Sequence, residues 1–205
     1  YEIHGNKEPL VILNGIMMSC ESWKPFIDDL SKNFKIILLD FLDQGKSSKA
    51  DCLYTNSNQA EILLTLLDTL NIEKVNLLGI SYGGEVAMHF AINYSNRLKK
   101  LILSNTTAYT NKLLLEIGFG WIKAAQTYNG NTFFESTMPY IYSHVFFEKK
   151  YEWLTERKEL FSQTLTKDWY EGFIRLVKSA EEHDVRNEIH NIKTPTLIIS
   201  SEYDI

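Results

Sequence analysis

The sequence predicts an α/β fold, with a mostly parallel sheet flanked by helices and a helical insertion before the last strand. Short, nearly continuous runs of Ile, Leu and Val alternate with amphipathic helical patterns, which is typical of strands covered on both faces. Residues 108–183 interrupt this alternation and contain no convincing strand pattern. The composition, 44% hydrophobic and 23% charged residues, is that of a globular protein.

Five segments are predicted strands because each is short and rich in aliphatic residues. Pro9 and Pro195 stand at the start of the first and the last of them, where a missing amide proton is tolerated. The predicted strands are residues 9–13, 35–39, 74–78, 98–103 and 195–199.

Helical patterns separate the first four strands. Residues 21–32 place Trp23, Phe26, Ile27 and Leu30 on one stripe, and residues 58–70 and 84–94 follow the same periodicity. This order of strands and helices predicts parallel pairing with right-handed crossovers.

The segment 108–183 contains more than half of the aromatic residues of the chain. No linker rich in Pro, Gly or Ser flanks it, so we predict a helical cap inserted into one domain. Residues 1–107 and 184–205 then form the core, which we expect to be incomplete at its C-terminus.

Charge and cysteine content exclude several functional classes. The chain has 21 Lys and Arg against 26 Asp and Glu, a net charge of −5, which argues against nucleic acid as a partner. No apolar run approaches the length of a membrane span. Cys20 and Cys52 make no disulfide framework and no metal-type spacing occurs, so we expect a cytoplasmic protein.

The motif with chemical meaning is G-x-S-x-G at Gly79, Ser81 and Gly83. A predicted strand ends at Leu78 and a helical pattern follows, which is the strand–turn–helix setting of a nucleophile elbow. Side chains in place of the two glycines would collide with the neighbouring strand and helix. The turn would present the Ser81 hydroxyl at a helix N-terminus, where a developing oxyanion is favoured. The alternative is a glycine-rich turn with an incidental serine.

With three further blocks, the chain resembles the α/β-hydrolase fold family. Leu13-Asn14-Gly15-Ile16 is similar to the family's oxyanion-hole loop, and Asp40–Ser47 is similar to its D-x-x-G-x-G-x-S loop. Thr194–Asp204 looks like the strand and turn that present the catalytic acid. The blocks follow the family's order and span essentially the whole chain, and the helical insertion falls where the family carries its cap.

The resemblance implies a role for four residues. Ser81 is the expected nucleophile, and the backbone amides of Ile16 and Tyr82 would form the oxyanion hole. Asp204 would orient the general base and stabilise its cation, although an aspartate after a strand is by itself also typical of an ordinary turn.

The sequence departs from the family pattern at the base. None of the five histidines stands after Asp204, so the catalytic histidine is expected beyond Ile205 and the chain is interpreted as stopping before it. His144, in the predicted cap, is kept as a possible substrate contact. Asn14 replaces the usual histidine before Gly15.

Asp40 and Asp43 lie in the second block. Asp43 replaces a usual glycine of the D-x-x-G-x-G-x-S pattern and is expected on a turn facing solvent. Asp40 is expected to hold its own loop through hydrogen bonds to the backbone.

The sequence therefore predicts a serine hydrolase of small carboxylic esters or lactones that works through an acyl-enzyme and needs no cofactor or metal. Hydrolysis of a C–C bond or thioester by the same fold, or a non-catalytic ligand-binding or sensor protein, stays open, as does the oligomeric state. The expected partner is a small-molecule substrate, with no nucleic acid and no membrane. Cap aromatics are expected either to roof an apolar pocket over Ser81 or to pack the cap itself; they are Trp121, Phe133, Phe134, Tyr140, Tyr142, Phe146 and Phe147.

Overall fold

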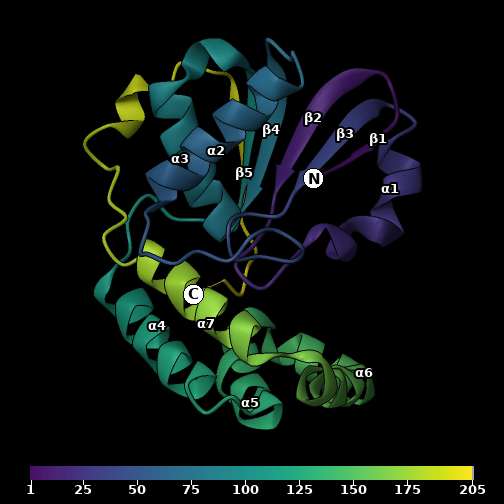
Figure 1. The fold of residues 1–205 in the computed structure, drawn as a ribbon, viewed down its shortest axis with the longest axis vertical. Helices are drawn as coiled ribbons and strands as arrows, with labels where there is room; N and C mark the ends of the chain where they lie inside the picture. The colour runs from purple at the N-terminus through teal and green to yellow at the C-terminus, as the bar shows by residue number, and fades with distance from the viewer. Residues whose placement is uncertain (205) are drawn as a thin grey trace.

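A computed structural model describes residues 1–204 and confirms the predicted α/β fold. Its sheet has six strands in the order β1-β3-β2-β4-β5-β6 (Figure 1). Every neighbouring pair is parallel except β1 with β3. The strands are β1 (Glu2–His4), β2 (Glu8–Leu13), β3 (Phe34–Leu39), β4 (Val75–Ile80), β5 (Leu98–Ser104) and β6 (Thr196–Ile199). The short antiparallel β1 is an addition to the five predicted strands.

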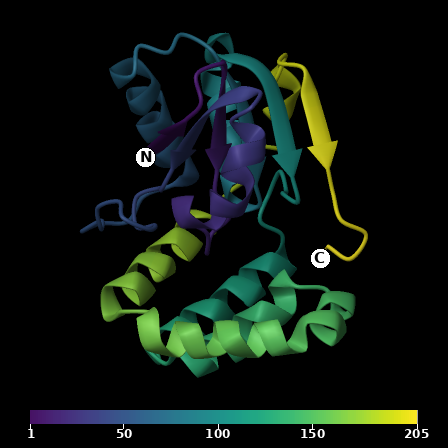
Figure 2. The ribbon, with the colours of Figure 1, turned by 90° about the vertical axis from the view of Figure 1, so that its right-hand side faces the viewer.

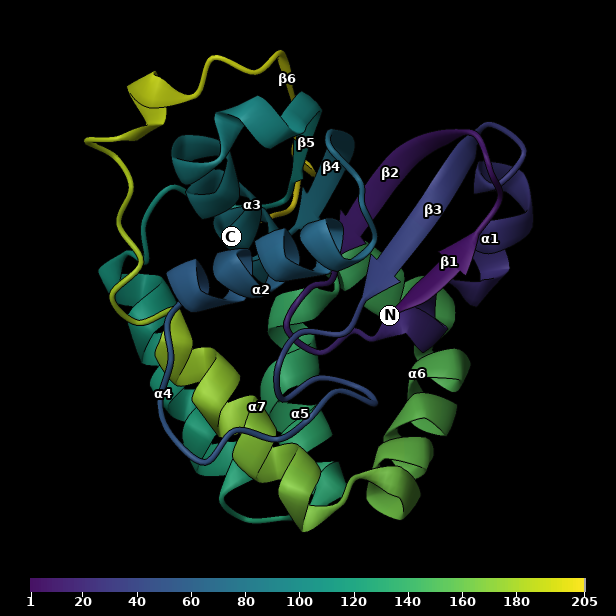
Figure 3. The same ribbon diagram turned by 45° about the horizontal axis from the view of Figure 1, so that its top comes forward.

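Helices cover both faces of this sheet. The 3-10 turn η1 (Cys20–Trp23) and α1 (Lys24–Leu30) lie on one face, and α2 (Asn56–Thr69) and α3 (Tyr82–Asn93) lie on the other (Figures 1 and 3). Short 3-10 turns, η2 (Ser95–Arg97) and η3 (Ile189–Asn191), precede β5 and β6.

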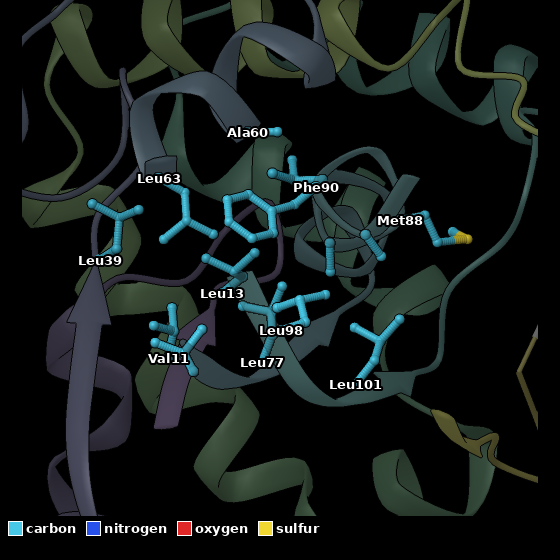
Figure 4. Packing of buried hydrophobic residues seen from close by; sticks show 14 of the residues in the cluster. Val11, Leu13, Leu39, Ala60, Leu63, Leu77, Met88, Phe90, Leu98 and Leu101 are labelled. Atoms are coloured by element: carbon cyan, nitrogen blue, oxygen red, sulfur yellow. The ribbon is translucent and has the colours of Figure 1, made fainter. Parts of the chain in front are cut away.

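Alternating side chains of the central strands fill the two layers. Val11, Leu13 and Leu77 pack with α2 and α3 in the larger core (Figure 4), whereas Leu10 and Ile12 pack with Trp23 on the opposite face. The near-continuous apolar runs arise because consecutive residues of a strand point to opposite faces and both faces are buried.

Four helices, which we call the helical layer, lie between β5 and β6 in the sequence. They cross the carboxyl ends of the strands (Figures 1 and 2). Each begins after an Asn, Ser or Thr whose side chain accepts a hydrogen bond from the backbone amide three residues later, a favourable N-cap. They are α4 (Lys112–Ala125), α5 (Gly130–Ile141), α6 (His144–Thr164, kinked at Lys150) and α7 (Lys167–Ser179).

Edge strand β6 differs from the prediction that both faces of every strand are covered. Its residues are exposed, and Ile198 has 73% of its surface accessible. Within residues 1–204 no element covers either face of β6 sufficiently to bury it. The last residue of the predicted core, Ile205, lies outside the described residues. No helix among the described residues has both the length and the apolar character needed to cross a membrane.

Candidate active site

Ser81 occupies a sharp turn between β4 and α3. Its backbone has φ 51° and ψ −121°, a conformation that residues other than glycine rarely adopt. This conformation costs free energy and persists only where the surrounding structure imposes it. The Ser81 amide donates to the carbonyl oxygen of Ser104 at 2.9 Å. Its own carbonyl oxygen accepts from the Thr106 hydroxyl at 2.8 Å and the Glu85 amide at 3.2 Å. The backbone is thus fixed while the side chain stays exposed.

The glycines on either side of Ser81 are required by close packing, as predicted. A Cβ at position 79 would lie 2.4 Å from the carbonyl oxygen of Gly83, and a Cβ at position 83 would lie 2.4 Å from that of Leu13. Both distances are far below van der Waals contact with backbone that cannot move aside. The local sequence therefore forms the strand–turn–helix geometry of a nucleophile elbow.

Ser81 opens onto a pocket of about 350 Å³ between the sheet and the helical layer, which we call the large pocket. A smaller cavity of about 130 Å³, the side pocket, also reaches Ser81. Asp204 lines the large pocket, so the structure brings two predicted site residues from distant parts of the chain to one cavity. The apolar side chains shared by both pockets are Ile16, Leu114, Ile117 and Trp121.

Asp204 is held by a residue that the sequence interpretation missed. The Asn105 side-chain nitrogen donates to Asp204 Oδ2 at 2.8 Å and to the Ser201 hydroxyl at 2.8 Å. Asn105 follows β5 directly and has φ 48°, a left-handed conformation that Asn tolerates better than most residues. An asparagine immediately after a strand that neighbours the elbow strand was the available signal.

Two residues that line cavities together with Ser81 have backbone amides without an acceptor among residues 1–204. Ile16 follows β2 and lines both pockets, and Tyr82 is the first residue of α3 and lines the side pocket. Among residues 1–204, neither amide donates a hydrogen bond. Free amide donors at a helix N-terminus are suited to a developing negative charge.

Gln44 holds the loop that carries Ile16, and the sequence interpretation did not find it. Its buried side-chain nitrogen donates to the carbonyl oxygens of Gly15 at 2.9 Å and Ile16 at 3.2 Å. Asn14 supports the same arrangement, because its amide donates to the Leu39 carbonyl at 2.9 Å and approaches Gln44 Oε1 at 3.4 Å. Holding these carbonyl oxygens restricts the orientation of the adjoining peptide groups.

Asp40 holds its own loop as predicted, accepting from the backbone amides of Cys20 at 2.7 Å and Lys46 at 3.0 Å. The prediction that Asp43 faces solvent is wrong. Only 2% of the Asp43 surface is accessible to solvent, and its carboxylate forms a bidentate ion pair with Arg175 of α7. This pair joins the helical layer to the sheet and raises the pKa of the Arg175 guanidinium.

Among the described residues, no histidine lines the large pocket. His89 and His183 pair with each other, with His89 Nε2 3.2 Å from His183 Nδ1. Because His183 Nε2 donates to the Thr107 carbonyl at 3.0 Å, its Nδ1 is the acceptor for His89. His144 comes close to the Asp204 turn, with its ring centroid 5.0 Å from that of Tyr203, in a separate cavity that Asp204 also lines.

The predicted cap aromatics divide between the two expected roles. Trp121 and Tyr140 line the large pocket, and the Trp121 indole nitrogen is buried without a partner among the described residues. Phe133 is fully buried inside the helical layer, 4.9 Å from Phe173 between ring centroids. Tyr142 and Phe146 stack on each other away from Ser81, at 4.7 Å.

Glu85 is a third residue that the sequence interpretation missed, after Asn105 and Gln44. It lies one helical turn after Ser81 and lines both pockets. Burial raises the pKa of its carboxyl to about 8, opposed only by a hydrogen bond from Asn56. The signal in the sequence was an acidic residue within the apolar helix that follows the elbow.

The model of the alpha/beta hydrolase fold family matches residues 8–205. The chain belongs to this family. An α/β hydrolase from a Medee basin deep-sea metagenome library, MGS-M2, superposes with a TM-score of 0.95 at 45% identity, over 98% of this chain and 75% of that one. The resemblance drawn from the four sequence blocks is thereby confirmed.

Two curated relatives of this α/β-hydrolase chain are named as a lactonase and a depolymerase. The 3-oxoadipate enol-lactonase 1 of Acinetobacter baylyi is 26% identical over 201 residues, which cover 97% of this chain and 72% of the lactonase. The poly(3-hydroxyalkanoate) depolymerase of Ectopseudomonas oleovorans is 38% identical over 100 residues, 49% of this chain. That match spans only 35%, about a third, of the depolymerase.

Proposed function

We propose that this protein is a serine hydrolase of small carboxylic esters or lactones that acts through an acyl-enzyme. The observation that carries the proposal is the strained Ser81 elbow, which opens onto an apolar pocket that Asp204 also lines. A pocket of about 350 Å³ whose lining surface is mostly apolar suits a small, mostly apolar ester. The enol-lactonase and depolymerase names support this chemistry.

In the proposed reaction, the Ser81 oxygen attacks the substrate carbonyl carbon as a general base removes its proton. The carbonyl oxygen becomes an oxyanion held by the amides of Ile16 and Tyr82. Collapse of this intermediate expels the alcohol, and water then releases the acid by the same route. The helical layer acts as the cap that closes the pocket over the sheet.

Asp204 is proposed to orient the base and stabilise its cation. Among residues 1–204 no histidine lines the large pocket with Ser81, so the proposal requires a histidine base that the described residues do not place there. The nucleophile, the oxyanion hole and the acid are all protein groups, so the reaction needs no cofactor. Among residues 1–204, no cluster of three or more His, Cys, Asp or Glu is arranged to hold a metal ion.

A fluorophosphonate probe tests the proposal in the protein expressed from its complete reading frame. Labelling should occur at Ser81, disappear in Ser81→Ala, and persist in Ser104→Ala, which removes a serine hydroxyl at the end of the neighbouring strand. Hydrolysis of methyl butanoate should follow the same pattern. Absence of both labelling and hydrolysis, with the protein folded, would favour the alternative of a non-catalytic ligand-binding or sensor protein.

Hydrolysis of a C–C bond or a thioester by the same residues is the alternative within the fold. Comparing a matched thioester and oxygen ester with the purified protein separates thioester hydrolysis from ester hydrolysis. A higher kcat/KM for the thioester would replace the ester proposal.

A further inference from the structure

An acidic side chain, Glu85, lines both pockets that reach Ser81. Within the part of the chain that the structure describes, no Lys, Arg or His lines the large pocket or the side pocket. The other ionisable side chains that line these cavities are the acids Asp204 and Glu181, together with the tyrosines Tyr82 and Tyr140. Glu85 is therefore not half of an ion pair.

The hydrogen bonding of Glu85 is incomplete on one side. Its Oε2 accepts from the Asn56 amide at 2.7 Å. Asn56 is fully buried at the start of α2, and its Oδ1 lies 3.4 Å from the Ser179 hydroxyl oxygen. Within residues 1–204, the other carboxyl oxygen, Oε1, has no partner. Because an amide N–H can only donate, Oε2 must be the accepting oxygen, and a proton on this carboxyl resides on Oε1.

Packing alone does not explain an acid at this position. Glu85 lines the same two pockets as Leu114, Ile117 and Trp121 of α4, and desolvating a carboxyl that accepts one hydrogen bond from the protein is unfavourable. A leucine would fill the same space without that cost. Glu85 lies in the first turn of α3, four residues after the N-cap Ser81, which puts it within reach of a substrate bound at Ser81.

We propose that Glu85 is a specificity-determining residue: its protonated carboxyl donates a hydrogen bond from Oε1 to a carbonyl or hydroxyl oxygen that the substrate carries in addition to its scissile group. This inference rests on the proposed function and narrows its substrate class to oxo- or hydroxy-substituted esters and lactones. The apolar walls of the pocket hold the carbon chain, and Glu85 selects the chain that has an oxygen one helical turn away from Ser81.

Matched ester pairs test this subsite. Methyl levulinate differs from methyl pentanoate by a ketone in place of a methylene group, and methyl acetoacetate differs from methyl butanoate in the same way. With protein from the complete reading frame, kcat/KM should favour at least one oxo ester over its partner by about tenfold, the value of one good hydrogen bond.

Three variants separate recognition from structure. Glu85→Leu should abolish the preference, so that the kcat/KM values of the oxo ester and its unsubstituted partner become equal. Glu85→Gln, whose side-chain amide can also donate a hydrogen bond, should keep part of the preference for the oxo ester. Glu61→Leu is the matched control, because Glu61 also approaches an asparagine amide, that of Asn58, but is exposed on α2; its preference should equal that of the unchanged protein.

A binding measurement keeps the inference independent of catalysis. In Ser81→Ala, the oxo ester should bind about tenfold more tightly than its partner by calorimetry, and adding Glu85→Leu should remove the difference. Since the pKa of the Glu85 carboxyl is raised to about 8, the tighter binding of the oxo ester should also decline above that pH, because Oε1 loses its proton.

The outcomes distinguish the two proposals. Selective binding of an oxo ester by Ser81→Ala without turnover by the unchanged protein would refute the serine hydrolase and retain the subsite. Turnover with no preference for either oxo ester, or a preference unaltered by Glu85→Leu, would overturn the subsite and leave the hydrolase intact.

Discussion

Replacing Arg175 with methionine should destabilise the protein strongly, because it leaves the Asp43 carboxylate buried without its counter-charge. The Asp43 side chain is completely inaccessible. Four donors reach it: Arg175 Nη2 at 2.7 Å, Arg175 Nε at 2.9 Å, the Tyr54 hydroxyl at 2.9 Å and the Ala50 amide at 3.0 Å. The substitution removes two of these and the only positive charge that contacts the carboxylate directly among the described residues.

Breaking a buried pair from one side costs about 3 to 5 kcal/mol. We expect about 3 kcal/mol here, the lower end, because Tyr54 and Ala50 still solvate the carboxylate. With a urea dependence of about 2 kcal/mol per molar, the midpoint of unfolding should fall by about 1.5 M. Circular dichroism during urea titration measures this shift.

Two further variants make the measurement specific. The double substitution Asp43→Asn with Arg175→Met should recover more than half of the loss, because Asn is neutral and tolerates the φ of 73° at this position. Arg186→Met is the control. Arg186 forms a bidentate ion pair with Asp184 in the same way, but both side chains are exposed, so the urea midpoint of this variant should move much less. Equal shifts for Arg175→Met and Arg186→Met would refute the reasoning.

Three other predictions follow from buried polar groups. Gln44→Leu should lower kcat about tenfold with little change in KM, because the carbonyl oxygens beside the Ile16 amide lose their donor; Gln59→Leu, which removes a buried glutamine from the Leu42 backbone, should leave kcat unchanged, and equal effects would contradict a positioning role. Burial lowers the pKa of His89 to about 4 and also lowers that of His183, so the folded state resists protonation and stability should fall as pH drops from about 6.5 towards 4. The urea midpoint of His89→Gln should fall less over this range than that of the unchanged protein. Parallel plots of midpoint against pH for the two proteins would count against this prediction. The raised pKa of Glu85 has the opposite effect on stability, because the unfolded state loses this proton first and stability is lost as pH rises from about 4.5 through 8. The stability of Glu85→Gln relative to the unchanged protein should therefore increase over that range. A constant difference between the two proteins would disprove this prediction.

Much of the fold could be predicted from sequence because parallel strands buried on both faces leave a pattern of consecutive aliphatic residues. The strand from Phe34 to Leu39 is an example, with four consecutive residues fully or nearly fully buried. The three-residue β1 had no such pattern, since it is an edge strand of half-buried and exposed residues. Its pairing with β3 is decided by the sheet rather than by its own residues.

The prediction for Asp43 failed for a related reason. A polar residue in a turn is usually solvated, and the local sequence contains nothing to suggest otherwise. Its partner Arg175 lies 132 residues away, and only the docking of α7 against the turn after β3 brings the two together. Asn105 and Asp204, 99 residues apart, are joined in the same way.

By itself, the sequence determined the elbow at Ser81, because the clashes that require Gly79 and Gly83 arise within a few residues of one strand–turn–helix unit and its neighbouring strand. The tertiary structure alone decided which polar groups surround that serine. Gln44, Asn105 and Glu85 acquire their surroundings from elements distant in the chain. A hydrogen bond or a desolvated carboxyl depends on what packs against it, and sequence spacing does not encode that packing.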